Sequence, residues 1–478
     1  MNNPASNKTD YIRLCETFAK YHCKLQREPD TLTNRIMKFR LECLVQEGEF
    51  QMFIFPMTHQ RGWHLWVGKV SVRDFCQGII DTIANFRHGI QLQKTHPKEI
   101  VHVLISQCRR KCREHNGNVR IIHSLKQLLM FLQTEYLPHC RKHVGLHSIT
   151  ADDRNYQQCI INEVTVLDTP LTIFRFGLIS LSHTIRRMNI EHRRVSARMR
   201  VKERIGKQKK QQDVVFGDLP PHIVETVSDD YSPMGSYHMG ADGVGRVILN
   251  RRFVTVSTLA SVLVHEAVPG HHLEFCVNSR RWAGTDAWLL SHFPGYIEGW
   301  ALYAETLVCK GNPLQKFRQL EMEMLRDVRM IVDTGMHSHF CGKWTYQECK
   351  TFMSTGMFRG IRLVKAFRGL SISRKQIKNE VLNICARPGY GISYKVGKFY
   401  FEEIRKMAAN RGMSTAKIHE VFLSQRVPLI NLHELFHKPK EDEGKENNKT
   451  SLTETLDKEL SPIQRFLMSE QLLSCCGH

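Results

Sequence analysis

The chain of 478 residues has a formal net charge of +21 at pH 7, and 42% of its residues are hydrophobic. This length and composition allow a large core, which excludes an intrinsically disordered protein and predicts one large domain or two closely packed halves. The 15 cysteines have no short repeating spacing, and the first ten residues lack the pattern of a signal peptide. Because no apolar run is long enough to span a membrane, we expect a soluble, cytoplasmic protein with reduced thiols.

The positive charge is concentrated in the first half of the chain. Residues 1–212 contain 35 Lys and Arg against 18 Asp and Glu. A cluster of 11 Lys and Arg lies between residues 186 and 210, and we interpret it as the solvated face of a helix that runs into a loop. The alternative is a binding surface for nucleic acid or for an anionic membrane. Nucleic acid is not favoured, because no aromatic residues interleave with the charges for base stacking.

Most of the chain has the periodicity of amphipathic helices. Apolar residues recur at three- and four-residue steps from Phe174 to Met199, after Pro170 at the expected helix start. Strand-like alternation is sparse, and its best candidate is Arg246–Asn250, followed by Phe253–Val256. The sequence therefore predicts a mainly α fold with a small β-hairpin or edge strand. Further stretches with helical periodicity are 73–87, 99–114, 120–136, 315–332, 346–366 and 397–408.

Residues 264–274 read Val-His-Glu-Ala-Val-Pro-Gly-His-His-Leu-Glu and gather several imidazoles and carboxylates. Imidazole nitrogens and carboxylate oxygens bind Zn²⁺, and a catalytic zinc site keeps one position open for water. Glu266 directly follows the candidate ligand His265, where it can take a proton from that water as a general base. The segment predicts a zinc centre with a catalytic carboxylate.

The spacing of the histidines requires a distorted helix. In the simple motif the two ligands stand four residues apart, whereas His265 precedes His271 by six residues and His272 by seven. On a regular helix neither pair could share one ion. Pro269 interrupts the hydrogen-bond ladder and Gly270 tolerates unusual backbone angles, so a local bulge can return one of the two histidines to face His265.

Four segments of the chain resemble, in order, the signature blocks of the domain-of-unknown-function 885 family, which is grouped with the helical, zinc-dependent gluzincin peptidases. Weaker similarity extends from about Phe55 to about Leu435. One departure is Tyr390, which stands where the family has Gln and which touches the expected cleft. The four segments are His-Glu-Ala-Val-Pro-Gly-His-His at 265–272, Glu-Gly-Trp-Ala-Leu-Tyr-Ala-Glu at 298–305, Arg-Met-Ile-Val-Asp-Thr-Gly-Met-His at 329–337, and Pro-Gly-Tyr-Gly-Ile-Ser-Tyr-Lys-Val-Gly at 388–397.

The resemblance implies a large helical metallopeptidase-like fold with an active-site cleft and an edge strand that pairs with extended substrate. It favours His271 over His272 as the second zinc ligand, because the related motif places its second histidine after Gly. It also implies that Glu298 is the third ligand, on the helix after the histidines. Glu305 lies on the same helix face but about 10.5 Å further along the axis, so we expect it to support the site rather than to bind the metal.

The resemblance further suggests candidates for catalysis and substrate binding. Tyr394 and His337 lie in family blocks and could donate a hydrogen bond to the developing oxyanion. Arg329 could bind a substrate carboxylate, or it could form a structural ion pair with Asp333 four residues later. The predicted substrate-binding residues are Arg329, Asn250 at the end of the strand candidate, and Tyr390.

We therefore expect three parts: a helical extension at 1–45, a helical zinc-peptidase-like domain at 46–437, and a flexible charged tail at 438–478 with a candidate short helix at 463–473. The expected function is zinc-dependent hydrolysis of peptide or related amide bonds in short peptides or aminoacyl compounds. The alternatives are a catalytically silent binding protein with the same fold, and a binder of nucleic acid or anions through the basic surface. Nothing in the sequence indicates the oligomeric state.

Overall fold

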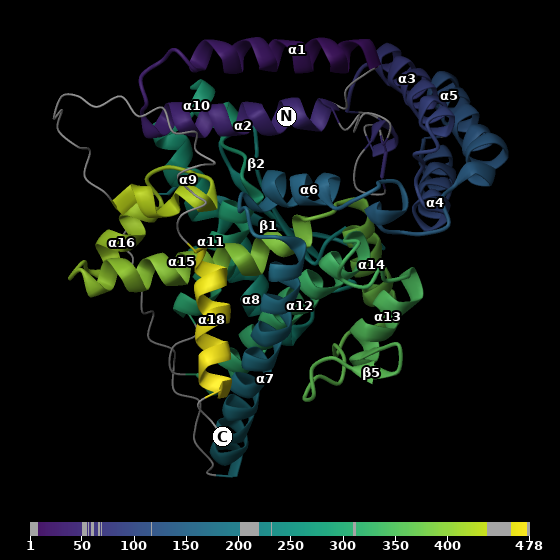
Figure 1. The fold of residues 1–478 in the computed structure, drawn as a ribbon. Coiled ribbons are helices and arrows are strands. Elements are labelled where there is room, and N and C mark those ends of the chain that lie inside the picture. The colour runs from purple at the N-terminus through teal and green to yellow at the C-terminus, as the bar shows by residue number, and fades with distance from the viewer. Residues whose placement is uncertain are drawn as a thin grey trace.

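The computed structural model describes residues 8–49, 55, 57–58, 62–65, 67, 69–115, 117–200, 219–230, 232–308, 312–436 and 460–475. Within these ranges the protein is mainly helical with two small β-sheets, which confirms the predicted fold class (Figure 1). Residues 201–210 of the basic cluster and 438–459 of the predicted tail lie outside the described ranges. Within the same ranges, no helix has the length and apolar character needed to cross a membrane.

The helices follow one another with short connections, and several match the predicted periodic stretches. In chain order they are α1 (Lys8–Leu25), α2 (Leu32–Glu49), α3 (Val72–Gln91), α4 (Lys98–Glu114), α5 (Val119–Phe131), α6 (Arg154–Val164), α7 (Pro170–Arg200), α8 (Val256–Glu266), α9 (His271–Trp282), α10 (Asp286–Leu290), α11 (Pro294–Val308), α12 (Pro313–His337), α13 (Tyr346–Thr355), α14 (Arg374–Ala386), α15 (Tyr390–Asn410), α16 (Thr415–Phe422) and α18 (Pro462–Cys475). Shorter helical turns lie at Trp63–Leu65, Leu132–Tyr136, Leu137–His139, Leu146–Ser148 and Leu429–Phe436.

Two hydrophobic cores meet along α7 and α12. The first core joins α3, α4 and α5 to α13 and α14, and the second joins α6 and α11 to α15 and α16. The long helix α7 contributes Leu181 to the first core and Phe176 to the second, and α12 contributes Ile331 and Met330 in the same way. Since α7 also packs along α12, these two helices connect the halves of the molecule.

The helices α11 and α15 approach each other unusually closely. A Cβ atom added to Gly299 of α11 would lie 2.5 Å from Cα of Gly397 in α15, so no larger residue fits at this crossing. The contact places the amino-terminal half of α15 beside α11. Both helices carry residues of the candidate site described below.

The larger sheet has three strands in the order β1-β3-β2, formed by β1 (His222–Val227), β2 (Gly235–Met239) and β3 (Gly245–Asn250). The predicted strand at 246–250 is therefore present, but it is the central strand and not the edge strand. Its neighbour β1 is parallel to it and β2 is antiparallel. The predicted continuation at Phe253–Val256 is wrong, because the chain turns there and α8 begins.

Within the described part of the chain, the edge strand β2 has no partner strand on the side away from β3. Asn250 donates to the carbonyl of Met234 and Gly240 donates to that of Val244, so even-numbered residues of β2 bond to β3. In an antiparallel ladder the residues between them point their N–H and C=O groups outward. Gly235, Tyr237 and Met239 therefore form the open edge, and Gly235 lies against α8.

The predicted helix at 346–366 is too long. The structure ends α13 at Thr355, and Gly356 follows in the left-handed conformation with a φ of 73°. The chain then forms the two-stranded sheet of β4 (Met357–Phe358) and β5 (Ile361–Arg362). Periodicity alone does not predict the end of α13, because apolar residues continue at helical spacing through the hairpin.

Candidate metal centre

His265 and Glu266 lie at the carboxyl-terminal end of α8. Thr255 caps the start of this helix by accepting a hydrogen bond of 3.3 Å from the Thr258 N–H. The buried side chain of Val262 anchors the helix against the β-sheet. These contacts place the last turn of α8 at the level of β2, where Gly235 packs against the Glu266 carboxylate.

The helix is broken between the two histidines. Helix α8 ends at Glu266 and α9 begins at His271, so the predicted distortion is a break between two helices and not a bulge within one. A Cβ on Gly270 would lie 1.9 Å from the carbonyl oxygen of His265. The close approach of the two backbone segments therefore requires glycine there. The indole of Trp300 holds the break by donating to the Pro269 carbonyl at 2.9 Å.

The break brings His271, and not His272, to the side of His265. Glu298 Oε2 lies 3.3 Å from His265 Nε2 and 3.4 Å from His271 Nε2. One ligand atom from each of these three residues lies within 4.8 Å of the other two. His272 turns away: its Nε2 donates to the Pro220 carbonyl at 2.9 Å. Its Nδ1 then accepts from the Tyr237 hydroxyl at 3.0 Å.

The three residues fit a divalent cation in spacing. Zinc binds imidazole nitrogen and carboxylate oxygen at about 2.0–2.2 Å, so the ligands of a tetrahedral ion stand roughly 3.3–3.5 Å apart. The separations of 3.3 and 3.4 Å from Glu298 to the two imidazoles lie in this range. Two imidazoles and one carboxylate are also a donor set typical of catalytic zinc. His265, His271 and Glu298 are therefore a candidate metal centre.

The charge of the cluster also fits a cation. Glu266, Glu298 and Glu305 are all buried, and Arg326 pairs with this group through Glu305 at 3.7 Å. Three carboxylates against one guanidinium leave two negative charges when the imidazoles are neutral. Buried charge of this kind requires a compensating partner. A bound divalent cation would supply it, and in its absence a protonated His265 supplies part of it.

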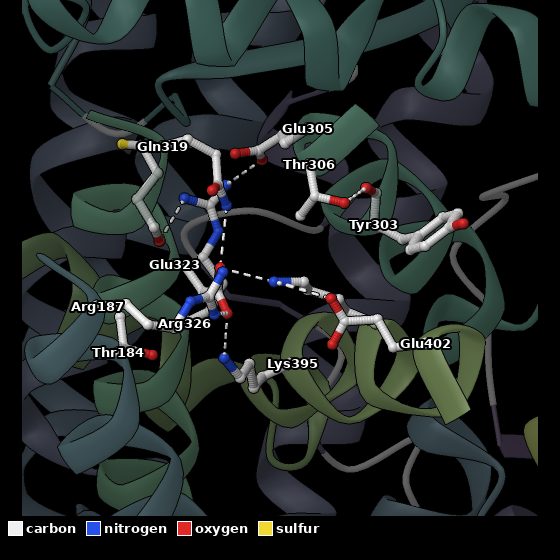
Figure 2. A network of polar contacts seen from close by, with 12 residues as sticks. Thr184, Arg187, Tyr303, Glu305, Thr306, Gln319, Glu323, Arg326, Lys395 and Glu402 are labelled. Carbon is white, nitrogen blue, oxygen red and sulfur yellow. Dashed lines mark hydrogen bonds and ion pairs between the residues drawn. The ribbon is translucent and has the colours of Figure 1, made fainter. Parts of the chain in front are cut away.

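A second buried network next to the site has no such imbalance (Figure 2). Glu323 of α12 accepts from Lys395 of α15 at 2.5 Å and lies 2.6 Å from Lys398. Lys395 also lies 3.2 Å from Asp327. Burial opposes the charge of Glu323, but Lys395 and Lys398 hold its pKa well below the usual value. Arg187 lies 3.3 Å from Glu323, and Glu402 lies 3.6 Å from Lys398. Three carboxylates and three cationic groups therefore balance, so this network ties α12 to α15 without requiring a metal.

Glu305 orients the first histidine. Its Oε1 lies 3.0 Å from His265 Nδ1, so the imidazole donates there and turns Nε2 toward Glu298. A carboxylate behind a metal-binding histidine commonly fixes the tautomer in this way. Glu305 therefore lies behind His265 and outside the group of three residues at ligand spacing.

Burial and the mutual contacts shift the pKa values of the cluster. Burial opposes the charge of Glu298, but His271 and His265 hold its pKa well below the usual value. Burial would lower the pKa of His265, but hydrogen bonds with Glu298 and Glu305 raise it to about 9. Burial raises the pKa of Glu266, which is the direction that helps a carboxylate to hold a proton during catalysis.

Tyr390 and Tyr394 also lie at the cluster. The Tyr390 hydroxyl donates to Glu298 Oε1 at 2.5 Å, and the Tyr394 hydroxyl donates to that of Tyr390 at 3.3 Å. The Tyr394 ring is stacked on His265 with 6.0 Å between centroids. Burial raises the pKa of both phenols, so both remain donors at neutral pH.

Arg329 lies beside Tyr394 but is already neutralised. It forms two hydrogen bonds of 2.6 and 2.9 Å with Glu380 and not the predicted pair with Asp333. Its guanidinium carbon is 5.2 Å from the centre of the Tyr394 ring. Sequence reasoning overlooked Arg326, which lies one helical turn earlier and contacts both Glu305 and the Tyr394 ring. Arg326 and Arg329 are three residues apart and therefore lie on the same face of α12, which is the sequence pattern that could have indicated Arg326.

The structure gives His337 and Asn250 roles other than the predicted ones. His337 is fully buried, accepts from the Leu146 N–H through Nδ1, and donates through Nε2 to the Ile384 carbonyl. No N–H remains for an oxyanion. Asn250 is also fully buried, and its amide donates to the Asp229 and Ser232 carbonyls at 3.0 Å. It therefore closes the turn before β2 and does not face a substrate.

Asp333 supports the segment that carries Tyr390. It is fully buried and accepts hydrogen bonds from the Tyr156 hydroxyl at 2.8 Å and from the Gly389 N–H at 2.9 Å. Gly389 immediately precedes α15, whose first turn has no cap from its own side chains. The Asp333 carboxylate thus caps α15 from a neighbouring helix.

Burial raises the pKa of Asp333 from 3.8 to about 7. The folded protein then holds a proton that the unfolded chain releases, so this stabilisation is complete below about pH 4 and is lost as the pH rises to about 7. The difference corresponds to about 4 kcal/mol. Because Asp333→Asn cannot ionise, we expect the free energy of unfolding of the variant to fall less between pH 4 and 7. Urea unfolding of both proteins at several pH values measures this; parallel pH profiles would contradict it.

The described residues define a helical protein with a candidate His-His-Glu metal centre. Residues 197–434, which include this centre, match the model of the family described as "Bacterial protein of unknown function (DUF885)". The predicted family resemblance is confirmed over this range. No curated protein matches the chain significantly in sequence.

Two solved bacterial structures resemble the chain in fold. A protein from Colwellia psychrerythraea described as a "putative lipoprotein" is 17% identical, with a TM-score of 0.68 over 90% of each chain. A "putative lipoprotein of unknown function" from Shewanella oneidensis is 11% identical, with a TM-score of 0.60 over 90% of this chain and 93% of the other. At these identities the likeness concerns the fold alone.

Proposed function

We propose that the protein is a zinc-dependent hydrolase of peptide or related amide bonds, related to the gluzincin peptidases. The observation that carries the proposal is the grouping of His265, His271 and Glu298 at ligand spacing, with Glu266 next to His265 at the end of α8. A catalytically silent relative would be expected to lack one of these four groups. All four are present and buried or nearly so.

Each side chain of the site has a separate role in the proposed hydrolysis. His265, His271 and Glu298 would hold the ion, and a bound zinc would polarise the scissile carbonyl and lower the pKa of an adjacent water. Glu266 accepts the proton of the attacking water and returns it to the leaving amine. The Tyr394 hydroxyl makes a long hydrogen bond of 3.3 Å to Tyr390, and it can donate instead to the carbonyl oxygen as charge develops.

The open edge of β2 supports an extended peptide as substrate. Gly235 of this edge packs against Glu266, so a strand paired with Gly235, Tyr237 and Met239 would pass the catalytic carboxylate. Backbone hydrogen bonds along such an edge bind peptides independently of side-chain identity. The side chains of His271 and Glu298 are each only 12% exposed. This limited access favours short or extended substrates over folded proteins.

The proposal predicts about one zinc ion per chain, because three protein ligands are the usual set of a catalytic site. Metal analysis after dialysis against zinc and then against metal-free buffer measures this number. The zinc-loaded protein should hydrolyse members of a library of short peptides, and removal of zinc by a chelator should abolish the activity. A chain that neither retains nor takes up zinc would refute the proposal.

A further inference from the structure

The two oxygens of Glu298 have different partners. Oε2 lies 3.3 Å from His265 and 3.4 Å from His271, on the side where an ion would be held. Oε1 accepts the Tyr390 hydroxyl at 2.5 Å. Hydrogen bonds of this length between a hydroxyl and a carboxylate are among the strongest in proteins. The carboxylate is therefore divided between the candidate metal position and Tyr390.

Tyr390 is held in place from three sides. Its ring lies beneath the guanidinium of Arg387, whose central carbon is 3.6 Å from the ring centre, and Arg387 is paired with Glu163 at 3.1 Å. Asp333 fixes the preceding residue by accepting the Gly389 N–H. Tyr394, one turn later, donates to the Tyr390 hydroxyl. The position of this hydroxyl is thus set by the fold and does not depend on a bound ligand.

We infer that Tyr390 is a positioning residue that makes Glu298 a ligand through one oxygen only. The inference rests on the proposed function, in that it takes the ion to bind at His265, His271 and Glu298. A carboxylate can bind a metal through one oxygen or through both. The hydrogen bond from Tyr390 would prevent Oε1 of Glu298 from binding the ion, so a coordination position would stay open for water or substrate. This role differs from the substrate contact expected from the sequence.

Removing the hydroxyl should change both the strength and the geometry of metal binding. In Tyr390→Phe, Glu298 loses the group that fixes its orientation, and Oε1 is free to turn toward the ion. Loss of a hydrogen-bonding partner of a metal ligand typically weakens metal affinity by about 10- to 100-fold. A second ligating oxygen would raise the coordination number, which in a cobalt-substituted protein weakens the visible absorption.

The experiment compares the full-length wild type, Tyr390→Phe and Tyr400→Phe. Tyr400 is a matched control, since it lies on the same helix and its hydroxyl also faces a carboxylate, that of Asp168 at 3.4 Å. Zn²⁺ affinity is measured by competition with a chelator, and the Co²⁺ form is examined by visible absorption. We expect about 10- to 100-fold weaker zinc binding and a weaker cobalt spectrum for Tyr390→Phe, and wild-type values for Tyr400→Phe. Thermal unfolding of the metal-free proteins verifies that both variants fold.

The outcomes separate this inference from the proposed function. Equal zinc affinity and equal cobalt spectra for wild type and Tyr390→Phe would overturn the role of Tyr390 alone. In another outcome, the wild type binds zinc but hydrolyses no amide, while Tyr390→Phe binds zinc more weakly and has an altered cobalt spectrum. That result would support the role of Tyr390 and count against the hydrolase. A wild-type chain that binds neither ion would overturn both. An equal loss in Tyr400→Phe would assign the effect to a general change in α15 and overturn the inference.

Discussion

Replacement of Glu266 by Gln is expected to leave zinc content and folding unchanged while lowering kcat by about 100- to 10,000-fold, the usual contribution of general acid–base catalysis. The amide has nearly the shape of the carboxylate but cannot accept the proton of the attacking water. Glu266 is also not among the three residues at ligand spacing. Metal analysis, thermal unfolding and steady-state kinetics on a peptide identified from the library measure the three quantities.

Glu420→Gln serves as the control for this substitution. Glu420 lies on α16, its side chain is 66% exposed, and it pairs only with nearby Lys417 in the described structure. The same chemical change there should leave kcat at the wild-type value. A Glu266→Gln protein with wild-type kcat would show that another group takes the proton, and the mechanism would then be wrong even if zinc were bound.

The two adjacent histidines should respond in opposite ways to replacement by Ala. His271→Ala removes a candidate ligand, so we expect zinc affinity to fall by more than the roughly 100-fold typical of losing a group that only hydrogen-bonds a ligand. His272→Ala should keep zinc affinity within a few-fold of wild type. It should instead lower stability by about 1–3 kcal/mol, because the Pro220 carbonyl and the Tyr237 hydroxyl lose their buried partner.

Chelator competition measures zinc affinity, and urea unfolding of the metal-free proteins measures stability. Each variant is the control for the other, since both delete one imidazole from the first turn of α9. A larger loss of zinc affinity in His272→Ala than in His271→Ala would contradict the arrangement around the helix break.

The sequence predicts much of the metal centre because its decisive features are local. His265, Glu266 and the Pro269-Gly270 step lie within a few residues, so helix geometry alone shows that the helix must be interrupted between the histidines. Glu298 follows from the resemblance to a known family. What remained open, the choice between His271 and His272, depends on Pro220 and Tyr237, which are distant along the chain.

Local pattern could not decide the roles of His337, Asn250 and Arg329. Each side chain has the chemistry for catalysis or binding, and each instead meets a partner far away in sequence, such as Ile384 for His337 and Glu380 for Arg329. The sequence did not predict the central position of β3 for a different reason. Its parallel neighbour β1 is exposed along nearly its whole length, so it lacks the alternating pattern that identifies a strand.

The close crossing of α11 and α15 limits how the sequence can change around the site. Glu298 and Gly299 are neighbours in α11, and Gly397 lies two turns after Tyr390 in α15. Any side chain larger than hydrogen at this crossing would widen the interaxial distance and draw the Tyr390 hydroxyl away from Glu298. The site therefore restricts substitution at two residues that have no functional group of their own, and these glycines should tolerate fewer replacements than the charged residues on the outer faces of the same helices.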